Sequence, residues 1–149
     1  MNSAVQNPTE PEAAQSVKLF QQLEGIVQTL RSERGCPWDQ RQTTASLKKY
    51  LLEEAAELAE AIDRDDGRHI AEEAGDLYFV LALLLRICEE QGRCSSAAAL
   101  SSICKKMRRR HPHVFAADGR PMPSDEQLRE QWERIKAEER AAAAPAAMV

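Results

Sequence analysis

The fold follows from residues 44–91, which read TASLKKYLLEEAAELAEAIDRDDGRHIAEEAGDLYFVLALLLRICEEQ. Apolar residues recur at helical spacing on both sides of the sequence DDG at residues 65–67, which is typical of a turn. The stretch therefore predicts two antiparallel helices, one over about 44–63 and one over about 68–91.

Helical periodicity continues on both sides of this hairpin. One helix is expected before the sequence GCP at residues 35–37, because glycine and proline stop a helix. Another is expected to begin at Ser95 or Ser96 and to end at residues 111–112, and a capping box from Ser124 to Gln127 opens a further one. Since no segment alternates with period two, the sequence predicts an all-α protein, a bundle of four to five helices.

Length and composition fit one globular domain. The chain has 149 residues, 43% of them hydrophobic, and we expect a disordered leader over 1–11, a domain over 12–140 and a disordered tail over 141–149. The longest apolar run, residues 77–85, is too short to cross a membrane, and no secretory signal is evident. We expect a cytoplasmic protein with unpaired cysteines, of which Cys88 and Cys104 lie in apolar helical patterns typical of buried thiols.

Acidic residues concentrate in the predicted hairpin. Placing Leu47 at zero on a helical wheel puts Glu54 at about 340° and Glu57 at about 280°, on or beside the apolar stripe. On the next helix, Glu73 lies in the middle of the apolar stripe and Asp76 lies at its edge. The two helices are expected to be neighbours, so these four carboxylates should converge.

Two interpretations of the four carboxylates remain open. A Glu-rich helix commonly has a solvated acidic face, but buried carboxylates without partners cost several kcal/mol each. An all-oxygen cluster suits a hard cation, above all Mg²⁺, with Mn²⁺ as the alternative ion. We therefore consider Glu54, Glu57, Glu73 and Asp76 candidate metal ligands. Glu53, on the polar border of its helix, is either solvated or placed to orient a water molecule.

A basic segment and a tryptophan also have two interpretations each. Five of the six residues over 105–110 are basic, and they either complement a helix C-terminus or bind phosphate through Lys106, Arg109 and Arg110. Trp38 is either a loop anchor or a platform on which a base stacks. The formal net charge of −4 argues against nucleic acid as the partner.

Several strings of the chain resemble one family. They are CPWDQRQT at residues 36–43, YLLEEAAE at 50–57, EEAGDL at 72–77, RRHPHVF at 109–115 and WERIK at 132–136. Over about residues 19–140, in collinear order, the sequence is similar to the MazG family of nucleoside triphosphate pyrophosphohydrolases.

This resemblance implies an enzyme with an all-α NTP pyrophosphatase fold that cleaves an acid anhydride. It implies Mg²⁺-dependent hydrolysis of NTP or dNTP to the monophosphate and pyrophosphate, in a homodimer or a dimer of dimers. Glu54, Glu57, Glu73 and Asp76 would hold the metal, as the wheel also indicates. Glu53 is the expected general base, and Glu54 is the second candidate catalytic residue.

Two rival functions stay open from the sequence. The first is a non-catalytic helical adaptor or nucleic-acid-binding module that uses the basic segment over 105–110. The second is a phosphatase that releases orthophosphate from the triphosphate.

Overall fold

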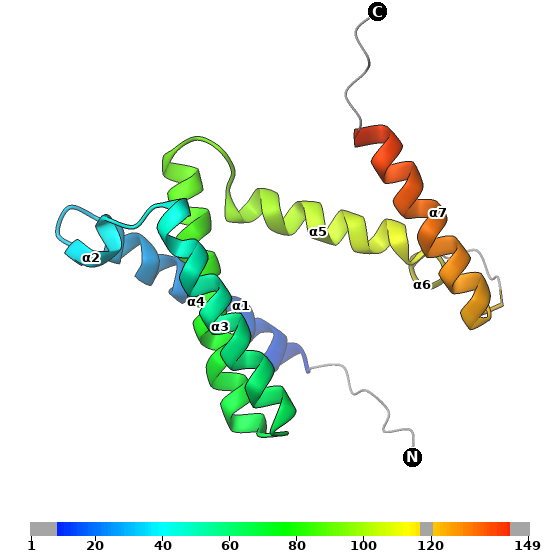
Figure 1. Ribbon diagram of the computed structural model, residues 1–149, viewed down its shortest axis with the longest axis horizontal. Helices are drawn as coiled ribbons and strands as arrows, with labels where there is room; N and C mark the ends of the chain where they lie inside the picture. The colour runs from blue at the N-terminus through cyan, green and yellow to red at the C-terminus, as the bar shows by residue number, and fades with distance from the viewer. Residues whose placement is uncertain (1–8, 117–120, 144–149) are drawn as a thin grey trace, which may run out of the picture. The chain divides into compact units, whose positions relative to one another are not determined.

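Helices are the only regular secondary structure in the part of the chain that the computed structural model describes, residues 9–116 and 121–143 (Figure 1). They are α1 (Glu10–Arg31), α2 (Pro37–Gln40), α3 (Thr44–Asp63), α4 (Gly67–Glu90), α5 (Ser96–Arg110), α6 (Pro112–Phe115) and α7 (Asp125–Ala143). The all-α class is confirmed. The described residues add two helices of four residues, α2 and α6, to the expected four to five, and a proline begins each of them.

The ends of the first and last helices reach into the segments expected to be disordered. Helix α1 begins at Glu10, where Glu12 accepts hydrogen bonds of 2.8 Å from both the backbone N–H and the hydroxyl of Thr9. Helix α7 continues to Ala143. The rest of the expected leader and tail, residues 1–8 and 144–149, lies outside the described residues.

The chain divides into two compact units, one over residues 1–96 and one over 97–149. In the first unit, α3 and α4 form the predicted antiparallel hairpin, and α1 packs against α4 (Figure 1). Asp66 caps α4 by accepting hydrogen bonds from the backbone N–H groups of Arg68 and His69. The buried core comes from α1, α3 and α4 and consists of Val27, Leu47, Ala82, Leu83 and Ile87.

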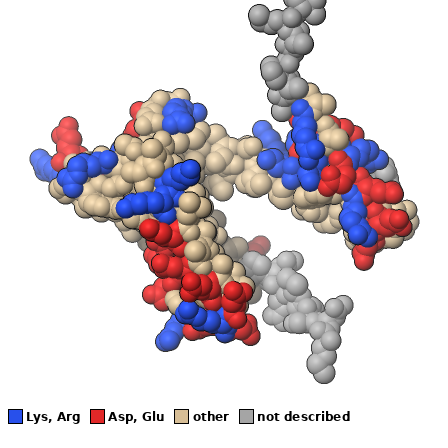
Figure 2. All heavy atoms as spheres, in the orientation of Figure 1, with Lys and Arg blue, Asp and Glu red and all other residues tan. Residues whose placement is uncertain are grey.

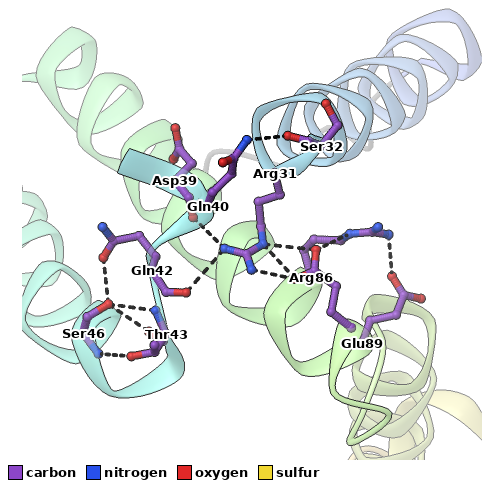
Figure 3. Close-up of polar contacts among 10 residues, drawn as sticks. Arg31, Ser32, Asp39, Gln40, Gln42, Thr43, Ser46, Arg86 and Glu89 are labelled. Carbon is purple, nitrogen blue, oxygen red and sulfur yellow. Dashed lines mark hydrogen bonds and ion pairs between the residues drawn. The ribbon is translucent and has the colours of Figure 1, made fainter. Parts of the chain in front are cut away.

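Arg31 joins α2 to the rest of the first unit. Its guanidinium donates hydrogen bonds to the backbone carbonyls of Asp39 and Gln42, at 2.6 and 3.4 Å, and forms a 2.6 Å ion pair with Glu90 of α4. Figure 3 shows Arg31 extending between the α2 segment and α4. Only 10% of the Arg31 side chain is exposed. Its hydrogen bonds to these two carbonyls hold the segment that carries Trp38 against α4.

The second unit is organised around α7. The predicted capping box is present, with Ser124 and Gln127 exchanging hydrogen bonds of 2.9 and 3.3 Å. Trp132 contacts the ring of His111 edge-on, and Ile135 is buried. The expectation that Cys104 is buried is wrong, because no residue of α5 is buried in the described structure, whereas Cys88 of α4 is buried as expected.

Among the described residues, no helix combines the length and the apolar character that a membrane crossing requires.

Candidate functional site

Three carboxylates meet where α3 lies against α4. One oxygen each of Glu54, Glu57 and Glu73 lies within 4.8 Å of the other two. Glu73 is buried, Glu54 is half-buried and Glu57 is exposed, so the cluster opens from the helix interface toward solvent. Figure 2 shows the acidic side chains gathered over these two helices. We name these three residues the carboxylate cluster.

The electrostatics of Glu54 reflect this crowding. Burial raises the pKa of its carboxyl above the usual range, and the negative charges of Asp76, Glu57, Glu73 and Glu53 raise it further, in that order. Asp76 is exposed and lies outside the three-oxygen cluster, but its charge acts on Glu54 more strongly than that of any other carboxylate. Three of the four expected metal ligands are therefore brought together, and the charge of the fourth, Asp76, acts on Glu54.

His69 is a member of the site that the sequence reasoning missed. Its Nε2 lies 2.8 Å from Oε1 of Glu73, one helical turn along α4. The signal was the spacing of four residues between His69 and Glu73, which places both side chains on one face of a helix. The contact gives the buried Glu73 carboxylate a polar partner and fixes its position.

The carboxylate cluster fits a hard divalent cation. Its donors are carboxylate oxygens only, which Mg²⁺ and Mn²⁺ accept readily. In the described part of the chain, no lysine or arginine forms an ion pair with any of the three residues, and His69 contacts Glu73 alone, so the negative charge of Glu54 and Glu57 is not neutralised by a basic side chain. A cation would supply that neutralisation.

Two other predicted site residues lie in the same unit. Glu53 is exposed on α3, beside Glu54 in the sequence, and contributes to the raised pKa of Glu54. Trp38 contacts Tyr50 of α3 edge-on, with ring centroids 5.5 Å apart, and 41% of its surface is exposed. Tyr50 thus anchors one edge of the indole while part of the ring remains accessible.

The predicted phosphate-binding residues lie in the second unit. Arg109 and Arg110, at the end of α5, both form ion pairs with Glu139 of α7, and Lys106 is half-buried nearby in the sequence. Hydrogen bonds from Arg110 and then Arg109 lower the pKa of Glu139 to about 2. Sequence reasoning did not find Glu139, because it lies 29 residues from Arg110 and no local periodicity links them.

Comparison with known proteins identifies the class to which this fold and site belong. Residues 42–115 match the family model of the MazG nucleotide pyrophosphohydrolase domain. That stretch contains α3, α4, the whole carboxylate cluster and both arginines. A crystal structure of a MazG-related protein from Thermotoga maritima has a TM-score of 0.65 and 26% identity, over 78% of this chain and 98% of that one.

Two named relatives are similar over most of this chain. The nucleoside triphosphate pyrophosphohydrolase/pyrophosphatase MazG of Thermotoga maritima is 40% identical over 82% of this chain and 46% of its own length. The nucleoside triphosphate pyrophosphohydrolase of Escherichia coli K12 is 44% identical over 78% of this chain and 44% of its own length. The chain belongs to the MazG family, and it spans less than half the length of these relatives.

Proposed function

We propose that this protein is a nucleoside triphosphate pyrophosphohydrolase, which converts an NTP or dNTP to the monophosphate and pyrophosphate. The observation that carries the proposal is the carboxylate cluster, three carboxylates within 4.8 Å that no described lysine or arginine neutralises, in a stretch that matches the MazG domain. Glu54, Glu57 and Glu73, with Asp76 as the fourth ligand, would hold Mg²⁺, or Mn²⁺ as the alternative. When bound, the ion supplies charge neutralisation for the polyphosphate and lowers the pKa of water.

Removal of the proton from the attacking water is assigned to a glutamate of α3. Glu53 accepts the proton of the water that attacks the α-phosphorus, and its exposure leaves the carboxylate free to reach that water. Glu54, whose pKa is raised, is the second candidate for this proton.

Binding of the nucleotide is assigned to four further residues. Lys106, Arg109 and Arg110 bind phosphate oxygens, because ammonium and guanidinium groups form charge-assisted hydrogen bonds to phosphate. Trp38 stacks on the base through the part of its indole that Tyr50 leaves accessible.

We also propose a homodimer or a dimer of dimers, located in the cytoplasm. Large apolar side chains that would otherwise meet water support the assembly; they include Leu19 and Ile26 of α1 and Leu52 and Ile62 of α3, each more than half exposed. The cysteines of the described residues are all unpaired, as is usual in a reducing compartment.

A product-resolved assay tests the proposed reaction. The chain is incubated with each common NTP and dNTP and Mg²⁺, and the products are separated by anion-exchange chromatography. The proposal predicts monophosphate and pyrophosphate in equal amounts, no turnover in chelator and none in Glu54→Gln. Glu60→Gln is the matched control, since Glu60 lies on the same helix but pairs with Arg64 outside the carboxylate cluster.

The rival functions predict different products. Diphosphate and orthophosphate would identify the phosphatase. Strongly salt-dependent binding to DNA or RNA without turnover would identify the adaptor.

A further inference from the structure

Glu139 accepts hydrogen bonds from the same edge, Nε and Nη2, of both Arg109 and Arg110. Its Oε1 accepts hydrogen bonds from Nε of Arg109, at 3.0 Å, and from Nη2 of the same residue. Its Oε2 accepts hydrogen bonds from Nε and Nη2 of Arg110, at 3.2 and 2.6 Å. One carboxylate thus binds the Nε edge of two guanidinium groups.

The other edge of each guanidinium has no hydrogen-bond acceptor at its Nη1 group among the described residues. A guanidinium has five N–H donors, and its Nη1 and Nη2 groups form a second edge that can bind an anion in the same forked manner. With Glu139 ionised, the three residues still carry one net positive charge.

The surroundings of Glu139 restrict how these groups can move. Only 18% of the Glu139 side chain and 19% of the Arg110 side chain are exposed. The Arg110 guanidinium also lies over the ring of Trp132, 4.9 Å from its centroid, so α7 contacts it in two places. Arg109, with 56% of its side chain exposed, has Glu139 as its ion-pair partner.

We infer that Glu139 is a positioning residue for phosphate binding, which holds Arg109 and Arg110 by their Nε edges and directs their free edges to the oxygens of a polyphosphate. The inference rests on the proposed function, which assigns both arginines to the phosphates. The benefit is preorganisation, because two long side chains held in place lose less conformational freedom when the anion binds.

The test exploits two opposite expectations for Glu139→Gln. Removing the negative charge makes the local net charge more positive, so electrostatics alone would tighten binding of an anion. Loss of positioning would weaken it. We would titrate the full-length chain with inorganic triphosphate, without metal, by isothermal calorimetry. The inference predicts that Glu139→Gln raises the Kd by about 10-fold, whereas Glu139→Asp, which keeps the charge, stays within about 3-fold of the wild-type Kd.

A matched control and a kinetic readout complete the experiment. Glu138→Gln alters an exposed neighbour that lies 3.9 Å from Arg134 and should leave the Kd unchanged. With NTP as substrate, Glu139→Gln should raise KM more than it lowers kcat, since it acts on binding.

The outcomes separate this inference from the proposed function. If Glu139→Gln binds triphosphate as well as or better than wild type, or only lowers the melting temperature, or if the wild type does not bind triphosphate, the inference is overturned. If the wild type binds triphosphate and the variant does not, the inference stands even when no nucleotide is hydrolysed.

Discussion

Replacing Glu54 by Gln should stabilise the metal-free protein while removing its response to Mg²⁺. Glutamine has the shape of glutamate but no charge, and Glu54 lies among the negative charges of Asp76, Glu57, Glu73 and Glu53. Like-charged pairs destabilise a helix by about 0.2–0.5 kcal/mol each, so relieving these repulsions should raise the free energy of unfolding by about 1 kcal/mol.

The raised pKa of Glu54 determines that Glu54→Gln increases, rather than decreases, the free energy of unfolding of the metal-free protein. A carboxyl whose pKa is higher in the folded than in the unfolded protein destabilises the fold increasingly as pH rises through the unfolded value of 4.5. Once the pH exceeds the raised pKa of the folded protein, that penalty is fully present, and Glu54→Gln should remove it. The gain should shrink to nothing below pH 4.5, where the carboxyl is protonated in both states.

The assay is thermal unfolding in chelator and in saturating Mg²⁺. An ion at about 100 times its Kd adds about 2.7 kcal/mol to the stability of the wild type, several degrees for a chain of this size. Glu54→Gln should therefore be the more stable protein in chelator and the less stable one in Mg²⁺. Glu60→Gln, the matched control on α3, should follow the wild type in both buffers.

Two results would contradict the role of Glu54 as a crowded metal ligand. One is an equal Mg²⁺-dependent stabilisation of wild type and Glu54→Gln, which would place the ion elsewhere. The other is a loss of stability of Glu54→Gln in chelator, which would mean that the carboxylate is satisfied by partners rather than repelled.

Three further predictions follow from the contacts described. Replacing Arg109 by Ala should lower kcat/KM by roughly ten- to a hundred-fold, because a charged hydrogen bond to phosphate is lost; unchanged steady-state kinetics with a lowered melting temperature would leave the arginine a structural role only. Replacing Arg31 by Ala should lower the free energy of unfolding by about 2 kcal/mol in urea titrations, because it breaks the ion pair with Glu90 and two hydrogen bonds to backbone carbonyls, and stability equal to wild type would contradict this. As pH falls from 4.5 to about 2, the wild type should lose stability relative to Glu139→Gln. The ionised Glu139 carboxylate stabilises the fold through its ion pairs, and protonation removes that contribution. Parallel pH profiles of the two proteins' stability would argue against the ion pairs with Arg109 and Arg110.

The hairpin and the inward placement of Glu73 could be predicted because both depend on local periodicity. Thr43 caps α3 and Asp66 caps α4, as residues of these types do at many helix starts, and the wheel placed Glu73 on the buried face where the structure has it. The wheel also placed Glu54 on the apolar stripe and Glu57 beside it, in agreement with the half-buried Glu54 and the exposed Glu57 of the structure.

Contacts between distant segments were beyond the sequence. Nothing local links Glu139 to Arg110, so neither interpretation of the basic segment, as a complement to the helix C-terminus or as a phosphate-binding site, included this internal partner. Arg31 likewise bonds with backbone carbonyls and with Glu90, 59 residues away. Such pairings arise from the tertiary fold, which periodicity does not encode. The short helices α2 and α6 were missed because four residues give no periodic signal.

Hydrolysis in water labelled with oxygen-18 shows whether water attacks the α-phosphorus of a nucleoside triphosphate, as proposed for this chain. Mass spectrometry of the products locates the label. Attack at the α-phosphorus places one labelled oxygen in the nucleoside monophosphate and none in pyrophosphate, and Glu54→Gln should give no labelled product. Label in pyrophosphate or in orthophosphate would contradict it, because the attack would then fall on the β- or γ-phosphorus.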